Sequence, residues 1–205
     1  MRKCFFLLVL LWGGVASQMS AQDMRVVFLN APDGIFPLLS SNDRADLVDY
    51  IDAGMKAKVT NRLDGTTELE ELGDDYMRLA TTASSAMQLK LLPLAGDTVI
   101  CVVKSVKAEA VDSHIYFYDK GWNMLDDGKF FDYPQIGDFF AADGDGALDM
   151  CDIYLVSLTL SAADDTLVAE YTMPVYMSAD DAAKITPLLR KLAYRWDGTR
   201  FVIGQ

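Results

Sequence analysis

The stretch FFAADGDGALDMCD at residues 139–152 carries the side chains best suited to metal chemistry. Asp143, Asp145 and Asp149 surround two glycines, and calcium takes several carboxylate oxygens on a tight loop with a glycine at its bend. Each alignment with a calcium loop nevertheless loses at least one ligand. The stretch therefore predicts either a weak calcium site or a polar connection between strands, and we favour the connection, where Gly and Asp serve the turn.

A second group of candidate residues lies in DKGWNMLDDGKFFDYP, where aspartates alternate with aromatic residues. Aromatic faces stack on sugar rings, so Trp122 and Tyr133 are candidate glycan-binding residues. A glycosidase would need two of the carboxylates together, one of them held protonated by apolar surroundings. With 30 acidic residues in the chain, such clusters also arise by chance, and aromatic residues in strands usually pack in cores.

The sequence contains few residues suited to other kinds of catalysis. His114 is the single histidine, and no Gly-x-Ser-x-Gly elbow or phosphate-binding glycine loop accompanies it. One histidine and two distant cysteines, Cys101 and Cys151, do not make a zinc site. The two cysteines could form one disulfide, but Cys101 lies within VICVV, where a thiol also serves as a small buried side chain.

The N-terminus predicts export. Two basic residues precede an apolar run too short for a membrane span, and small residues follow, which is the pattern of a secretory signal peptide. We expect cleavage after Ala21, with Ser17 as the alternative, leaving residues 22–205 as one domain in the periplasm, outside the cell or at its surface. No later stretch is long and apolar enough for stable membrane insertion.

The remaining chain is strongly acidic. Residues 1–21 carry two basic and no acidic side chains, so residues 22–205 carry 16 basic and 30 acidic side chains. Their net charge is −14, compared with −12 for the whole chain. Such a charge excludes nucleic acid as an expected partner, because phosphate binding requires Lys and Arg. It favours solubility, and leaves a protein or a glycan as the expected partner.

The elements that must position these residues are mainly strands. Hydrophobic alternation or apolar runs predict strands around MQLKLLPL, TVICVVKSVK, HIYFYD, CDIYLVSLTL and DTLVAEYTMPVYM, and Asp64-Gly65 predicts a hairpin turn. Pro93 and Pro174 should mark edges or bulges. Two helices are expected, the first capped by Ser40 or Ser41 and ended by Gly54.

The second expected helix begins near Ser178 with a capping box and carries Ile185, Leu188, Leu189 and Leu192 as its apolar stripe, with Pro187 kinking it or opening a new helix. The fold class follows as α+β: a largely antiparallel, twisted sheet system covered by two helices. Residues 89–106 and 156–173 share a strand–turn–strand pattern. This pattern indicates either duplicated units near 84–131 and 150–203 or only the similar residues that hairpins in general use, and we favour the second explanation.

The segments ELGDDYMRL, QLKLLPL, VICVV, DSHIYFYDKGW and YRW together resemble an uncharacterised family of exported proteins from Bacteroidales-type bacteria. The resemblance covers nearly the whole chain beyond the signal peptide and implies a Gram-negative exported protein of unknown role. It supplies no catalytic residues. From the residues themselves we expect a non-catalytic binding protein with no cofactor. A weak calcium or glycan module is the alternative, and a carboxylate-dependent hydrolase is the least favoured hypothesis.

Overall fold

The computed structural model describes residues 23–141 and 145–204, so the expected signal peptide lies outside the described residues. The α-helices are α1 (Met24–Leu29), α2 (Ser41–Asp52), α3 (Asp145–Leu148) and α4 (Ala179–Ile185). The strands are β1 (Lys58–Thr60), β2 (Thr66–Leu72), β3 (Tyr76–Thr82), β4 (Ser85–Leu94), β5 (Asp97–Lys107), β6 (Val111–Tyr118), β7 (Val156–Leu160), β8 (Thr166–Tyr171), β9 (Leu192–Trp196) and β10 (Phe201–Ile203). Short 3-10 helices are η1 (Asp127–Lys129), η2 (Ile136–Phe139), η3 (Met173–Tyr176) and η4 (Thr186–Leu188).

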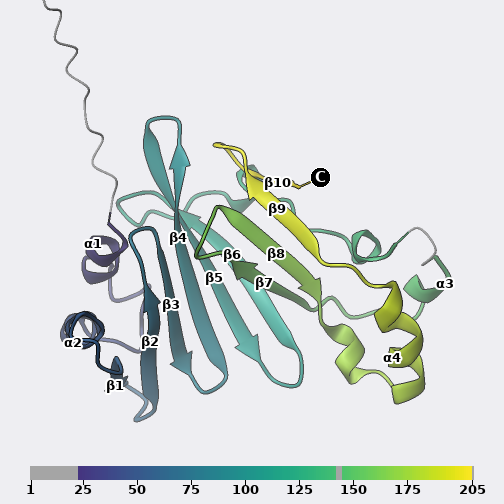
Figure 1. Cartoon of the computed structure of the whole chain (residues 1–205), viewed down its shortest axis with the longest axis horizontal. Coiled ribbons are helices and arrows are strands. Elements are labelled where there is room, and N and C mark those ends of the chain that lie inside the picture. Colours follow the sequence, from purple (N-terminus) through teal and green to yellow (C-terminus); the bar gives the residue numbers. More distant parts are fainter. Residues whose placement is uncertain (1–22, 142–144, 205) are drawn as a thin grey trace, which may run out of the picture.

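The strands form two antiparallel sheets in which each strand pairs with its neighbour in sequence (Figure 1). The large sheet has the order β1-β2-β3-β4-β5-β6, and the small sheet has the order β10-β9-β8-β7. The expected α+β fold with mainly antiparallel sheets is therefore confirmed. Within the described residues, no helix is both long and apolar enough to cross a membrane.

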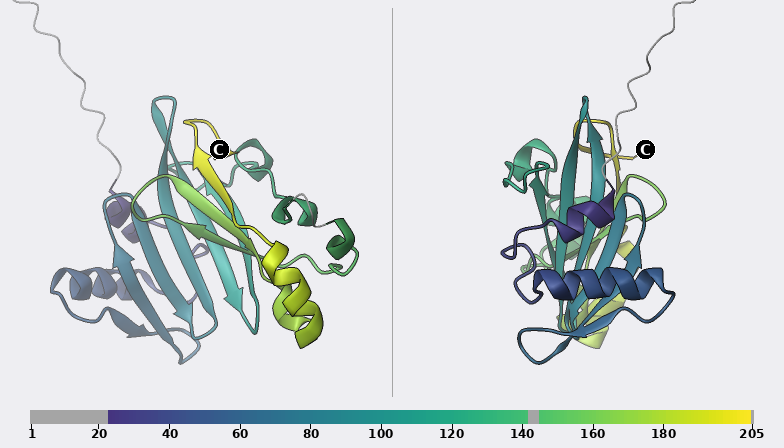
Figure 2. Two further views of the ribbon diagram at one scale, coloured as in Figure 1. Left: turned by 45° about the vertical axis from the view of Figure 1, so that its right-hand side comes forward. Right: turned by 90° about the vertical axis from the view of Figure 1, so that its left-hand side faces the viewer.

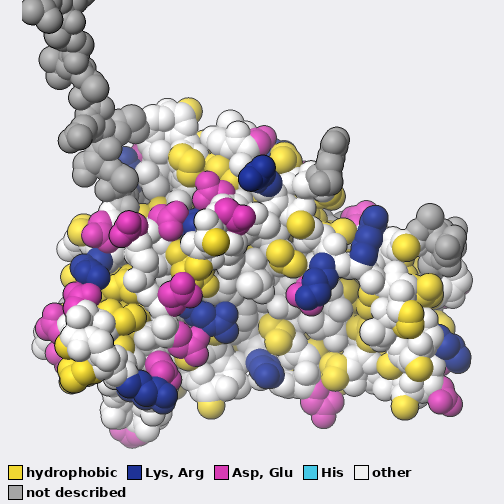
Figure 3. Space-filling view, viewed as in Figure 1, with side chains coloured by type: hydrophobic (Ala, Val, Ile, Leu, Met, Phe, Trp, Pro, Cys, Tyr) yellow, Lys and Arg dark blue, Asp and Glu magenta, His cyan; other side chains and the backbone are white. Residues whose placement is uncertain are grey.

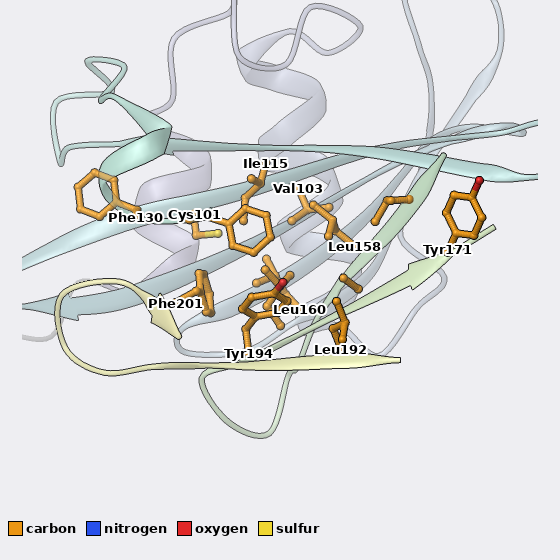
Figure 4. Packing of buried hydrophobic residues seen from close by; sticks show 14 of the residues in the cluster. Cys101, Val103, Ile115, Phe130, Leu158, Leu160, Tyr171, Leu192, Tyr194 and Phe201 are labelled. Carbon is orange, nitrogen blue, oxygen red and sulfur yellow. The ribbon is translucent and has the colours of Figure 1, made fainter. Parts of the chain in front are cut away.

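The small sheet packs on one face of the large sheet, which we call the front face, and α1 and α2 pack on the opposite, rear face (Figure 2). Strand β5 shows both faces: Val99, Cys101 and Val103 join the core shared with the small sheet, whereas Ile100 and Val102 join the core shared with the helices. Because both sides are apolar and covered, the centre of β5 is buried throughout, as its unbroken apolar run predicts. Figure 4 shows the front core between the sheets.

Helix α2 has the expected start. The Ser40 hydroxyl accepts a hydrogen bond from the Asp43 amide, and the Asp43 carboxylate accepts one from the Ser40 amide, a complete capping box. Helix α1 was not predicted, because its six residues directly follow the expected cleavage region. It supplies Met24, Val27 and Phe28 to the rear core.

The second expected helix is shorter than predicted and does not cover a sheet. It ends at Ile185, where η4 with Pro187 follows, and Leu192 already belongs to β9. Helix α4 lies beyond the ends of β8 and β9 (Figure 1) and contributes Ile185 to the front core. Pro187 therefore ends the helix, and α1 takes the place of the second covering helix.

Side chains of the large sheet hold the small sheet in position. The buried Gln88 accepts the Leu160 amide with its Oε1 at 3.0 Å, and Asp112 accepts the Val156 amide at 3.3 Å. On β9, two strands away from β7, the Trp196 indole donates to the Pro93 carbonyl at 2.7 Å. Amides at the free edge of β7 are thus satisfied by the front face, and the position of one sheet on the other is set by directional bonds.

Lys90 is the largest departure from the strand pattern. Its alternation with apolar neighbours in β4 would place it in solvent on a half-buried strand, yet only 2% of its side chain is exposed, because the small sheet covers the front face. Its Nζ lies 2.9 Å from Asp75 Oδ2 and 3.8 Å from Asp165 Oδ1. Desolvation raises the pKa of the Asp165 carboxyl.

The structure also places the prolines and cysteines that the sequence singled out. Pro93 lies in β4 beyond its pairing with β3, so this part of β4 is locally an edge, as expected of a strand proline. Pro174 follows β8 in η3, outside the strand predicted to contain it. Cys101 and Cys151 are both buried free thiols, so no disulfide joins them.

Candidate functional site

The front face carries a groove, because the small sheet covers only part of it. A hollow of about 410 Å³, which we call the front groove, lies between β7 and the ends of β3, β4 and β5. Most of its lining side chains are small or carry hydroxyl groups: Ala80, Thr82, Ala83, Ser84, Ser85, Ala86, Ser105, Ser157 and Thr159. Hydroxyl groups both donate and accept hydrogen bonds, so the groove suits a polar partner.

The front groove continues over the edge of the large sheet. A second hollow of about 440 Å³ shares Ala80, Thr82 and Ala83 with it and extends to Lys58 and Glu68. Most charges along this path pair with each other. Arg78 Nε donates to Glu70 Oε2 at 2.6 Å, and Lys58 Nζ lies 3.0 Å from Glu68 Oε2.

Lys107 is the exception, since it has no carboxylate partner among the described residues. It therefore gives the groove one cation that can pair with an incoming group. Figure 3 views this side of the molecule: acidic side chains gather over α1, α2 and β1–β3, and hydrophobic ones gather toward α4.

The rear face carries a smaller, apolar pocket. It has a volume of about 140 Å³ and lies between the segment Ile35–Leu39 and the rear sides of β2 to β5, including Leu79 and Met87. Lys104 also lines this pocket, and its Nζ lies 5.4 Å from the Tyr116 ring centroid. We call this the rear pocket.

Trp122 and Tyr133, the predicted glycan-binding residues, lie on different cores. The Trp122 ring packs against Phe36 and Tyr118 in the rear core, and its backbone has a φ of 61°. Tyr133 packs against Phe131 in the front core, and its hydroxyl accepts the Ile115 amide at 3.1 Å. The two rings do not form one platform, and each already has a packing role.

The acidic residues near them serve local structure. Asp119 accepts bonds from the amides of Gly121 and Asn123, and the Asn123 side chain lowers the pKa of its carboxyl. Asp132 pairs with Arg200, which lies in the turn between β9 and β10. His114, the one histidine, is exposed on β6, with Nε2 3.8 Å from Asp112.

The predicted calcium residues are only partly described. Asp143 lies outside the described residues, α3 begins at Asp145, and Asp149 is exposed. Over the ranges 23–141 and 145–204, no three Asp, Glu, His or Cys side chains gather as metal ligands would. The calcium hypothesis stays a prediction.

Sequence reasoning missed the front groove, its continuation toward β1 and the rear pocket. The front groove depends on how far the small sheet extends over the large one, which no local pattern encodes. Two features of the sequence could have indicated these hollows. Ser and Thr recur around the turn at residues 81–85, which lines the front groove, and Lys104, which lines the rear pocket, interrupts the apolar run of β5.

Comparison with known proteins places the chain in a wider group. A model of the family described as "Protein of unknown function (DUF3256)" matches residues 16–201. A solved domain of an uncharacterized protein from Porphyromonas gingivalis W83 is similar, with a TM-score of 0.77 and 25% identity over 90% of this chain and 98% of that one. No curated protein matches. The resemblance to uncharacterised proteins of Bacteroidales-type bacteria is confirmed to that extent.

Proposed function

The chain belongs to the DUF3256 family, and from this premise we propose that it is a non-catalytic binding protein whose binding surface is the front groove. The observation that carries this proposal is the incomplete cover of the front face. The small sheet leaves open a hollow of about 410 Å³ that continues toward β1.

The occupant that the groove fits best is an extended segment of a partner protein. Small residues such as Ala80 and Ala83 leave room for a backbone, and the hydroxyl groups can bond its amides and carbonyls. No aromatic side chain lines either hollow among the described residues, so sugar stacking has no support there. Lys107 favours a segment that carries a carboxylate.

The same lining gives little support to catalysis. Its two carboxylates, Glu68 and Glu70, are each paired with a basic side chain. The lysine neighbours Lys58 and Lys56 lower the pKa of Glu68, which disfavours the protonated form that a general acid requires. A hydrolase remains the least favoured hypothesis.

A peptide-display selection tests the groove. We expect peptides selected on the wild type to be rich in Asp or Glu and to bind at least about tenfold more weakly to Ser157→Trp and Lys107→Glu, a loss of about 1.4 kcal/mol. Ala193→Trp, on the exposed side of β9, is the matched control and should bind normally. Selected peptides that bind Ser157→Trp as well as wild type would rule out the front groove.

Export is part of the same proposal. The N-terminal pattern supports a cleaved signal peptide and a protein that acts in the periplasm or outside the cell. The intact mass of the protein purified from cells should correspond to a chain beginning at Gln22, or at Gln18 for the alternative cut. A chain that retains residues 1–21 in the purified protein would contradict export by this route.

A further inference from the structure

The rear pocket is built for a small apolar group. Its walls are the side chains of Ile35, Phe36 and Leu39 on one side and of Leu79 and Met87 on the other. Thr67 also lines it, but the Thr67 hydroxyl donates to the Thr81 carbonyl at 2.8 Å, so that group is already satisfied. A closed apolar cavity of about 150 Å³ is known to accept benzene, so about 140 Å³ accommodates a group of about six carbons.

Of the described residues that line the rear pocket, only Lys104 carries a charge. Lys104 is half-buried, and no carboxylate among the described residues lies within ion-pair distance of its Nζ. The groups nearest to it on β6 are the Tyr116 ring and, directly across the strand pair, the exposed His114. The chain has a net charge of −12, which repels anions, so an unpaired lysine beside an apolar hollow gives an anion a local site of opposite charge.

Hydrogen bonds and ion pairs fix the segment Ile35–Leu39, which forms one wall of the rear pocket. Arg44 is buried, donates to the Ala31 carbonyl at 2.8 Å and pairs with Asp33. Arg62 also pairs with Asp33, and its amide donates to the Leu38 carbonyl at 3.0 Å. The segment that closes the pocket is therefore fixed at several points, which lowers the entropy lost when a ligand binds.

We propose that the rear pocket binds a short apolar carboxylate, with the apolar part in the pocket and the carboxylate paired with Lys104. Two sources share this chemistry: a free carboxylic acid of about six carbons, and the apolar C-terminal residue of a peptide. This site lies on the opposite face from the front groove and does not depend on it.

Titration with defined probes tests the assignment. The probes are hexanoate, hexanamide and acetate, followed by the methyl NMR signals of Met87 and Leu79. We expect hexanoate to shift these signals and to bind at least about tenfold more tightly than the other two, because only hexanoate supplies both parts. Lys104→Met should reduce hexanoate binding to the level of hexanamide. Lys129→Met, exposed in η1 and outside the front groove and the rear pocket, is the control and should bind like wild type.

A second set of probes separates the two sources. A pentapeptide ending in leucine with a free carboxylate is compared with its amidated form. Tighter binding of the free form than of hexanoate assigns the site to a peptide C-terminus, and the reverse order assigns it to a free acid. The proposal fails if hexanoate and hexanamide bind equally, if folded Lys104→Met binds hexanoate like wild type, or if no methyl signal near the pocket moves.

Discussion

Lys90 places an ammonium group between the two sheets, where water scarcely reaches it. Its partners are less enclosed, since about half of the Asp75 side chain and over a third of the Asp165 side chain remain exposed. The ion pair is therefore asymmetric. Removing the two carboxylates leaves the buried Lys90 ammonium without a counter-charge, whereas removing the lysine leaves carboxylates that water can still solvate.

This asymmetry predicts unequal variants. Lys90→Met keeps the aliphatic length and should lower the free energy of unfolding by only about 0–2 kcal/mol. The double variant Asp75→Ala/Asp165→Ala should lower it by about 3–5 kcal/mol, because the ammonium is left without a counter-charge. Urea denaturation measures both, with Lys107→Met as the exposed-lysine control. A Lys90→Met variant less stable than the double variant contradicts the asymmetry.

The aspartates near Gly146 invite a simpler measurement. We expect the melting temperature to be the same in millimolar calcium and in chelator, because Asp149 is exposed and the residues around it belong to or directly follow α3. Binding to the native state alone must raise stability. A rise with calcium that disappears in Asp145→Asn would support the calcium hypothesis instead.

At the scale of elements, the start of α2 can be tested by one hydroxyl group. Ser40→Ala removes the acceptor for the Asp43 amide and should lower the free energy of unfolding by about 1 kcal/mol. Ser41→Ala, one residue later and exposed, is the matched control with little expected effect. Equal losses in the two variants would show that the cap adds nothing specific.

The same cap carries a pH dependence. The Ser40 amide, and then its hydroxyl group, hold the pKa of Asp43 below its ordinary value of 3.8. The carboxylate therefore stabilises the fold above that ordinary value, and the contribution is lost as the pH falls through the lowered pKa. We expect Asp43→Asn to flatten the loss of stability between about pH 5 and pH 2. An unchanged acid limb in urea melts would contradict this.

Sequence patterns predicted elements better than they predicted what covers them. The capped start of α2 and the turn at Asp64, which has a φ of 57°, follow from local chemistry. The burial of Gln88 and Lys90 does not, because alternation separates two faces of a strand without saying that a second sheet lies on the polar one. The front groove and the rear pocket could not be predicted, since both depend on the placement of distant segments.

At the scale of the whole molecule, the two thiols report on whether the sheets stay together. Both belong to the front core, and burial raises the pKa of the Cys101 thiol well above its ordinary value, so little reactive thiolate forms. In the variant Cys151→Ser we expect no labelling of Cys101 by a maleimide under native conditions and complete labelling in urea. Rapid native labelling would mean that the sheets separate readily.

The sequential pairing of strands has a consequence for the order of folding. Every strand of the large sheet pairs with its neighbour in the chain, so the contacts that build it span short loops and can form early. All six strands end by Tyr118, before any strand of the small sheet begins. A growing chain can thus complete the large sheet while Val103, Ile115 and Phe117 on its front face are still exposed to water. Until the small sheet is complete at β10, this exposed apolar face makes the chain prone to aggregate.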